Sequence, residues 1–186
     1  MRETILQIIS SIKPIDKLEE ENINDTISWI ESGEEIFRIQ KPDVPPKHLV
    51  SYFVVIDIGK KKILLMDHIN AGLWLPSGGH IELNEHPKAT VQREIMEELN
   101  LSADFISETP FFITQTITIN IGAGHTDVSL WYLLNGNSEE KISYDKNEFN
   151  GYKWFGCNEI LETEKTKLDP HMHRFIEKLL SFKLLT

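Results

Sequence analysis

Three glutamates are spaced so that a single helix would bring their carboxylates together. Glu94, Glu97 and Glu98 stand at positions i, i+3 and i+4 within the segment 79–101. Successive helical residues rotate by about 100°, so these side chains fall within one arc of roughly 100°. Three like charges at this spacing repel one another, whereas a hard divalent cation such as Mg²⁺, which prefers oxygen ligands, would reverse that effect. Taken alone, the pattern also fits a solvated acidic helix face.

The residues beside the glutamates favour the metal interpretation. A Gly78-Gly79 turn lies upstream, and glycines allow the backbone to approach a metal or a phosphate closely. Glu85 precedes the expected helix and Arg93 lies on its flank, where the two could form an ion pair that holds the carboxylates in place. The opposite side of the helix is expected to face the core and carries Ala89, Val91, Ile95, Met96 and Leu99.

This segment resembles the Nudix hydrolase box, G-x5-E-x7-R-E-U-x-E-E-x-G-U, in which U is a bulky apolar residue. The preceding sequence LWLPSGGHIE is also typical of that family. The one departure is Asn100, which replaces the last glycine at a position where a left-handed residue ends the helix; asparagine is the best substitute there. The positions that match in register are Gly79, Glu85, Arg93, Glu94, Ile95, Glu97, Glu98 and Leu101.

The resemblance implies a Mg²⁺- or Mn²⁺-dependent hydrolase that cleaves a pyrophosphate linkage in a small nucleotide-like molecule. By the same resemblance, Glu94, Glu97 and Glu98 would ligate the metal together with the carbonyl of Gly78. Glu97 or Glu94 is the expected general base, because a glutamate within hydrogen-bond reach can remove the proton of the attacking water.

The resemblance also assigns roles to residues outside the three glutamates. Arg93 and Glu85 would orient the metal-binding set. Family members often recruit a further carboxylate from a downstream loop, and Glu148, six residues before Trp154, is the candidate here. The alternative for Glu148 is an ordinary surface glutamate.

Four residues are candidates for substrate binding, namely His80, His125, Trp131 and Trp154. His80 follows the Gly-Gly turn and is expected to touch phosphate. His125, Asp127 and Trp131 share one face of a strand by period two, and that face could floor a pocket in which Trp131 or Trp154 stacks on a base. The alternative is a set of core aromatics beside a solvated edge. The sequence does not choose the substrate.

The remaining patterns predict the elements that position these residues. Amphipathic spacing predicts two N-terminal helices, and a proline-containing linker follows at 41–48. Several strands interrupted by a central helix and closed by a final one predict a Nudix-type α/β/α sandwich with a mixed β-sheet. Residues 1–48 would be a helical extension, serving as a lid, a dimer surface or a packing brace, and 49–186 the hydrolase domain. The expected elements are hairpin strands at 50–57 and 63–66, a strand at 73–76, a helix at 87–99, hairpin strands at 113–121 and 125–134, a strand at 152–157, and a helix capped by Asp169-Pro170.

Charge and cysteine content limit the possible partners. The formal net charge of −10 disfavours long nucleic acid and anionic membranes, because the basic residues are scattered. The single cysteine, Cys157, cannot form an internal disulfide, which favours a reducing compartment. The first residues show no signal-peptide pattern and no run long enough to span a membrane. We therefore expect a cytoplasmic protein, with a homodimer as one arrangement, that acts on a small phosphorylated molecule.

Two other functions compete with hydrolysis. A Nudix-fold binding or regulatory domain would sense a nucleotide without cleaving it, but such domains usually lose box carboxylates that this chain keeps. An isoprenoid diphosphate isomerase would use a cysteine and a glutamate in its pocket. Cys157 lies far along the chain from the box and outside any matching motif, which argues against that chemistry.

Overall fold

The computed structural model describes residues 1–41, 43–118 and 124–185, and the chain folds into two compact units. The first unit contains Met1–Tyr52, Gly78–Arg93 and Ser107–Tyr132. The second contains Phe53–Ser77, Glu94–Ile106 and Leu133–Thr186. Four elements contribute residues to both units: β1 (Lys47–Asp57), β4 (Ser77–His80), α3 (Pro87–Leu99) and β6 (Thr126–Asn135).

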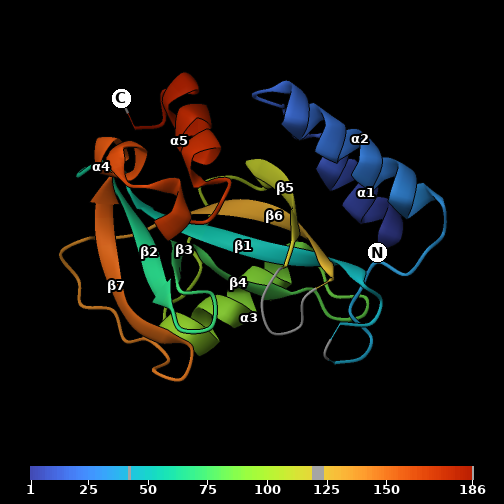
Figure 1. The fold of residues 1–186 in the computed structure, drawn as a ribbon, viewed down its shortest axis with the longest axis horizontal. Coiled ribbons are helices and arrows are strands. Elements are labelled where there is room, and N and C mark those ends of the chain that lie inside the picture. Colours follow the sequence, from blue (N-terminus) through green and yellow to red (C-terminus); the bar gives the residue numbers. More distant parts are fainter. Residues whose placement is uncertain (42, 119–123, 186) are drawn as a thin grey trace. The chain divides into compact units, whose positions relative to one another are not determined.

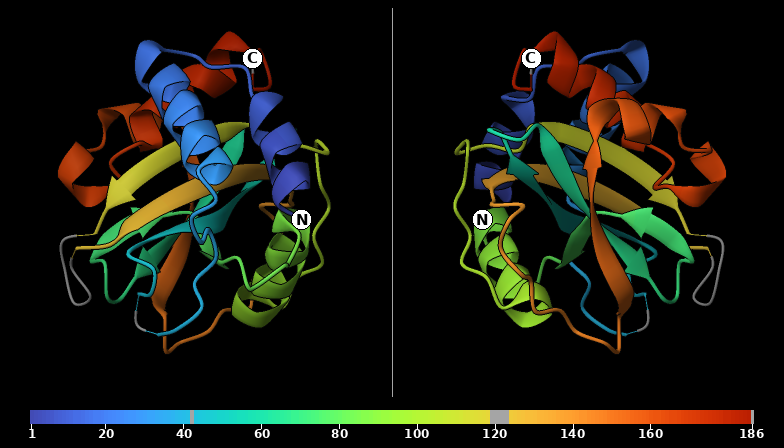
Figure 2. Two further views of the ribbon diagram at one scale, coloured as in Figure 1. Left: turned by 90° about the vertical axis from the view of Figure 1, so that its right-hand side faces the viewer. Right: turned by 90° about the vertical axis from the view of Figure 1, so that its left-hand side faces the viewer.

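The first unit combines two N-terminal helices with part of the sheet. Helices α1 (Arg2–Ser10) and α2 (Lys17–Glu31) run beside each other (Figures 1 and 2, blue). Asp16 begins α2, because its side chain accepts a hydrogen bond from the amide of Glu19 at 2.8 Å. In the sheet, β4 (Ser77–His80) pairs with β1, β1 neighbours β6, and β6 pairs antiparallel with β5 (Phe112–Ile117).

Polar contacts, one of them buried and one exposed, fasten helix α2 to β5. The buried carboxylate of Glu19 accepts hydrogen bonds from the amides of Ile15 at 2.8 Å and Ile113 at 3.3 Å. Gln115 on β5 donates from its Nε2 to Asp25 Oδ2 at 2.7 Å. These contacts support the packing brace among the three roles considered for the N-terminal helices.

The second unit is built around β2 (Lys62–His68). This strand pairs antiparallel with β1, with β3 (Leu73–Leu75) and, over most of its length, with β7 (Phe149–Gly156), which is orange in Figure 1. After β7 the chain forms α4 (Cys157–Glu162), a short 3₁₀ turn (Lys165–Lys167) and α5 (Met172–Ser181). The apolar stripe of α5 is buried and consists of Met172, Phe175, Ile176 and Leu179.

Most predicted elements are present, including the first hairpin and α3 with the predicted bounds. The predicted turn at 77–79 is instead part of β4, and the close approach of β4 to β1 requires the glycine at position 78. A Cβ on Gly78 would lie 2.3 Å from the carbonyl oxygen of Ser51, so only glycine allows β4 to approach β1 this closely. Helix α4 was not predicted, and the turn predicted at 122–124 falls mostly outside the described residues.

Two details of the helix predictions were wrong. The final helix begins at Met172 with His171 as its N-cap residue, and the side chain of Asp169 instead accepts a hydrogen bond from the amide of His171 at 2.8 Å. On α3, Met96 is 46% exposed and Glu98 only 6% exposed, so the helix is rotated relative to the predicted apolar face. Within the described ranges, no helix is both long and apolar enough to cross a membrane.

The predicted left-handed ending of α3 is confirmed. Asn100 has φ +53°, and its amide donates to the carbonyl of Met96 at 3.1 Å. The amide of Leu101 then donates to the carbonyl of Ile95 at 3.3 Å. These two bonds satisfy carbonyls of the last helical turn, which carries Glu97 and Glu98.

The conformation of Asn100 leads to a stability prediction. Asn100→Gly should be neutral or should raise the free energy of unfolding by a few tenths of a kcal/mol, because glycine adopts positive φ without steric cost. Asn100→Val should lower it by about 1 kcal/mol or more, because a β-branched side chain clashes in this conformation. Urea unfolding of the three proteins measures both effects, and a valine variant as stable as wild type would contradict the assignment.

Candidate functional site

The carboxyl group of Glu98 is buried in the second unit without a hydrogen-bonding group at one of its oxygens. The side chain is 6% exposed, and Oε2 has no hydrogen-bond partner among the described residues. Burial and, to a smaller extent, the neighbouring carboxylates of Glu94 and Glu148 together raise the pKa of Glu98 to about 9. The nearby hydroxyl of Ser77 favours the ionised form but does not outweigh these effects.

Glu148 reaches Glu98 because a loop is fastened to the end of α3. The amide of Asp145 donates to the backbone carbonyl of Glu98 at 2.8 Å, and the amide of Glu148 donates to the carbonyl of Asp145 at 3.3 Å. The carbonyl of Glu148 in turn accepts from the amide of Ile69 at 2.8 Å. The structure therefore brings together three of the predicted site residues, Glu94, Glu98 and Glu148.

This donor set fits a hard divalent cation. Glu94 is half-buried and Glu97 is exposed, while Glu98 offers a buried oxygen with no hydrogen-bonding group to replace water. Burying a carboxylate costs several kcal/mol unless it is protonated, hydrogen-bonded or bound to a metal. Because every donor here is a carboxylate oxygen, Mg²⁺ or Mn²⁺ suits the set better than a softer ion.

In the first unit, Glu85 and Arg93 form the predicted ion pair. Arg93 donates from Nε to Glu85 Oε1 and from Nη2 to Oε2, both at 3.1 Å. Glu85 Oε2 also accepts from the Thr90 hydroxyl at 2.8 Å and from the amide of Glu82 at 3.0 Å. Burial alone would raise the pKa of Glu85, but these hydrogen bonds hold it below its ordinary value.

The same guanidinium reaches the strand that carries the glycines. Arg93 Nη2 donates to the backbone carbonyl of His80 at 3.2 Å, which ties the first half of α3 to the end of β4. On the other side, the hydroxyl of Ser51 on β1 donates to the carbonyl of Pro87, the first residue of α3, at 3.0 Å. Arg93 and Ser51 thus fix the start of α3 against the two strands.

The two histidines predicted to bind substrate belong to a compact group in the first unit. His80 and His125 lie beside His48, Asp43 and Asp127. Burial and the nearby Arg38 guanidinium lower the pKa of His80 to about 3, so its imidazole is uncharged at neutral pH. A positively charged His80 is therefore not available to pair with phosphate.

The predicted aromatic platform at Trp131 does not fit the structure. Trp131 is fully buried, and its indole Nε1 donates to the Thr114 hydroxyl at 3.0 Å, so it is a core residue with no face open to a base. Trp154 is half-buried in the second unit and borders a cavity of about 320 Å³. Its indole N–H is buried without a hydrogen-bond partner in the described chain, so Trp154 stays a candidate for substrate contact.

Sequence reasoning missed Ser77, His48, Asp43 and Arg38. Ser77 gave no signal because it was assigned to a turn, whereas its hydroxyl is buried beside Glu98. The other three lie within residues 38–48 and have no regular spacing to His80 or His125. Their proximity follows from strand pairing and loop geometry, which a single sequence does not specify.

Comparisons with known proteins identify related sequences and folds. The family model of the NUDIX domain matches residues 47–179. A curated relative, Nudix hydrolase 25 of Arabidopsis thaliana, is 27% identical over 159 residues, covering 75% of this chain and 90% of that protein.

Solved structures show the same fold at low sequence identity. A NUDIX-family hydrolase from Clostridium perfringens aligns with a TM-score of 0.57 and 20% identity over 73% of this chain and 97% of that one. The MutT protein of Methanosarcina mazei Go1 aligns with a TM-score of 0.58 and 20% identity over 74% and 96% of the two chains. Both share the mixed α/β architecture predicted for this chain.

The raised pKa of Glu98 predicts how the stability of metal-free protein depends on pH. The folded state keeps a proton on Glu98 that the unfolded chain loses above about 4.5. The contribution of Glu98 to stability is therefore complete below that value and is lost as pH rises toward about 9, by up to about 1.4 kcal/mol per pH unit. Glu98→Gln removes this loss, so its stability relative to wild type should rise with pH.

Urea unfolding in the presence of a chelator, at pH values of about 5.5 and about 8.5, would measure this difference. Glu97→Gln is the matched control, because it removes the same charge from an exposed position on the same helix. A stability difference between Glu98→Gln and wild type that is equal at both pH values would show that Glu98 ionises normally.

Proposed function

The chain belongs to the Nudix hydrolase family and is a pyrophosphohydrolase, and from this premise we propose that it cleaves a phosphoanhydride bond in a nucleoside diphosphate-linked or related small molecule. We propose that Mg²⁺ or Mn²⁺ bound to Glu94, Glu97 and Glu98 supports the reaction. The observation that carries the proposal is the buried Glu98 oxygen, which has no hydrogen-bond partner in the described chain and lies close to two further carboxylates.

A phosphoanhydride resists hydrolysis partly because its negative charges repel the attacking water. A divalent cation held by Glu94, Glu97 and Glu98 would neutralise part of that charge and would make the attacking water more acidic. The chain supplies the carboxylate oxygens of Glu94, Glu97 and Glu98, and we assign the carbonyl of Gly78 to the same set. Glu98 would have to be ionised to hold the cation, because a protonated carboxyl is a poor ligand.

A second carboxylate must accept the proton of the attacking water. Glu97 and Glu94 are the proposed bases, and Glu148 is the third candidate, as base or as a further ligand. Glu148 is exposed and lies close to Glu98, so it can exchange protons with solvent while remaining near the reaction. We do not assign Glu98 as the base, because an oxygen that holds the cation is not free to accept a proton.

Arg93 and Glu85 act as positioning residues. Two parallel hydrogen bonds of 3.1 Å fix the guanidinium against the carboxylate, and this fork fixes the rotation of α3 about its axis. The next residue along the helix is Glu94, so its direction depends on that rotation. Neither residue needs to touch the substrate for its loss to impair hydrolysis.

The substrate is proposed to be small. The net charge of −10 opposes binding of long nucleic acid, and we place the reaction in a reducing compartment such as the cytoplasm on the basis of the single cysteine. Trp154 beside its cavity is the proposed contact for a base or another flat group. A homodimer stays a prediction from the sequence.

The two competing functions are less well supported. A domain that binds a nucleotide without cleaving it has no need for the carboxylates at Glu94, Glu97 and Glu98, all of which are kept here. For isomerase chemistry, Cys157 would have to act as a reactive thiol. Burial raises the pKa of Cys157 above its ordinary value, which keeps it as the less reactive thiol at neutral pH.

We predict that Glu98→Gln lowers kcat/KM for phosphoanhydride hydrolysis at least about 100-fold at saturating Mg²⁺, because the ion loses its most buried ligand. Glu162→Gln is the matched control, since it removes an exposed carboxylate from α4, and should retain activity. Release of phosphate or of a nucleoside monophosphate measures the rate. A Glu98→Gln variant as active as wild type would favour the binding-domain alternative.

The substrate class can be determined with a panel of phosphoanhydrides. The panel contains nucleoside triphosphates, nucleotide sugars, dinucleoside polyphosphates and coenzyme A, each assayed with Mg²⁺ and with Mn²⁺. We expect at least one to be hydrolysed with a kcat/KM above about 10⁴ M⁻¹ s⁻¹, the lower end for enzymes acting on their own substrates. Binding of several members without turnover of any would contradict hydrolysis.

A further inference from the structure

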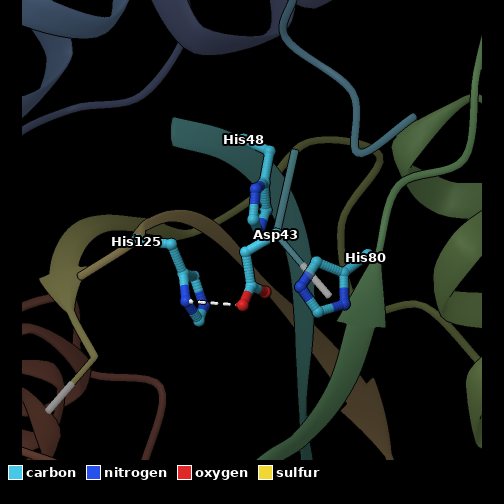
Figure 3. Close-up of side chains that lie close together, drawn as sticks. All are labelled: Asp43, His48, His80 and His125. Carbon is cyan, nitrogen blue, oxygen red and sulfur yellow. Dashed lines mark ion pairs between the residues drawn. The ribbon is translucent and has the colours of Figure 1, made fainter. Parts of the chain in front are cut away.

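Three histidines and an aspartate converge in the first unit. His48 lies on β1, His80 ends β4, His125 directly precedes β6, and Asp43 lies between α2 and β1. One ligand atom from each lies within 4.8 Å of all the others. Figure 3 shows the three rings and the Asp43 carboxylate pointing toward one another.

The backbone fixes which nitrogen of His48 faces this group. His48 is fully buried, and its Nδ1 lies 2.8 Å from the carbonyl oxygen of Pro45, so Nδ1 must carry a proton and donate it. The other nitrogen, Nε2, has no hydrogen bond of acceptable geometry among the described residues, although it lies 3.1 Å from Asp127 Oδ1. A metal-ligating histidine commonly donates its second N–H to a carbonyl in this way.

One carboxylate oxygen of Asp127 also lies among the three histidine rings. Asp127 Oδ1 lies 3.1 Å from His48 Nε2, 3.4 Å from His125 Nε2 and 4.0 Å from His80 Nε2. It is buried and makes no hydrogen bond within the described chain. A buried carboxylate surrounded by ring nitrogens requires either protons on those nitrogens or a cation to compensate its charge.

The spacing suits a tetrahedral ion with nitrogen ligands. Metal–nitrogen bonds of about 2.0–2.1 Å place the ligand atoms of a tetrahedral zinc site about 3.4 Å apart. His125 Nδ1 and Asp43 Oδ2 already lie 3.4 Å apart, and the whole set spans at most 4.8 Å. Small rotations of the side chains would close the remaining distance.

We propose that His48, His80, His125 and Asp43 form a binding site for Zn²⁺ or a similar divalent transition metal, with Asp127 as the compensating carboxylate beside it. Three neutral imidazoles and two carboxylates carry a charge of −2, which a divalent cation balances. Imidazole nitrogens favour zinc, copper, nickel and iron over Mg²⁺. This ligand chemistry differs from that of the all-carboxylate set on α3, and the inference does not rest on the proposed hydrolase function.

Arg38 controls access to the site. Its Nη1 lies 3.3 Å from His80 Nε2, so the guanidinium occupies the position that an ion would need at this histidine. Arg38 and His80 also border a cavity of about 300 Å³, through which the arginine side chain can withdraw. The metal therefore competes with the Arg38 guanidinium for His80, and replacing Arg38 by an uncharged residue should strengthen metal binding.

The full-length protein, freed of metal with a chelator and dialysed, is titrated with Zn²⁺ and separately with Co²⁺. We expect one ion per chain at the histidine site. The Co²⁺ form should show the intense visible absorption of a tetrahedral site, and X-ray absorption spectroscopy of the Zn²⁺ form should show three imidazole nitrogens at about 2.0–2.1 Å. Wild type should also melt at a higher temperature with Zn²⁺ than without it.

Substitutions then locate the ion. His48→Gln and His125→Gln should each weaken Zn²⁺ binding by more than about 100-fold, since even loss of a residue that merely orients a ligand costs 10- to 100-fold. His125→Gln serves as the second variant because His48 is fully buried, and circular dichroism checks that each variant folds. Arg38→Ala should bind Zn²⁺ more tightly, and His173→Gln, on α5, is the matched control that should bind like wild type.

A double variant separates this proposal from the proposed function. Glu97→Gln/Glu98→Gln should keep the tetrahedral Co²⁺ spectrum while losing Mn²⁺ binding at the carboxylates. The proposal is overturned if the double variant loses Zn²⁺, if the metal shell contains only oxygen, or if His125→Gln binds Zn²⁺ as wild type does. It is also overturned if wild type binds no Zn²⁺, because the cluster would then be held by protons on the histidines.

Discussion

The buried carboxyl of Glu98 is the constraint on which the candidate catalytic site depends. A carboxylate loses several kcal/mol of hydration when it is buried, and here one oxygen has no hydrogen-bonding group of the described chain to replace the water. The fold nevertheless brings Glu94 and Glu148 close to it, and both raise its pKa further. Such an arrangement disfavours the ionised protein alone and favours the protein with a cation bound.

Several features of the second unit serve to hold this unfavourable group in place. The left-handed Asn100 ends α3 directly after the glutamates, and the amide of Asp145 binds the backbone carbonyl of Glu98 itself. That second contact brings the loop with Glu148 to the same carboxyl. Burial of Glu98 destabilises the folded state locally, and the surrounding backbone hydrogen bonds offset this cost. Such local destabilisation is common at ligand-binding sites.

The first unit treats its buried polar groups in two other ways. The carboxylate of Glu85 accepts hydrogen bonds from the guanidinium of Arg93, from Thr90 and from a backbone amide, so it stays ionised without a metal ion. The group around His48 is intermediate, because His48 Nε2 and Asp127 Oδ1 lie 3.1 Å apart and neither has a hydrogen bond within the described residues. The same physical cost of burial is thus met by an internal salt bridge in one place and, as we propose, by two different metal-ligand sets elsewhere.

The sequence by itself determined the elements whose signals are local. Period-two and period-3.6 patterns identified the hairpin strands and α3, Asn100 marked the end of that helix, and fixed spacing along it identified Glu94, Glu97 and Glu98 as a set. The pair of Glu85 and Arg93 was also accessible, because both residues belong to the same short segment. The short β4 and α4 were missed, since a glycine-rich strand and a six-residue helix carry too few periodic positions.

Only the tertiary structure decided which of these residues are buried and which distant residues meet. Helical spacing places three glutamates on one arc but does not give the rotation of the helix against its neighbours, so the burial of Glu98 and the exposure of Met96 were not foreseen. Trp131 had the pattern of a sheet-face residue, yet packing determined that this face is core. His48 and His80 lie on two strands and His125 directly precedes a third, and the arrangement of these strands sets the distances between the histidines. Such proximity depends on contacts between residues far apart in the chain, which no local pattern records.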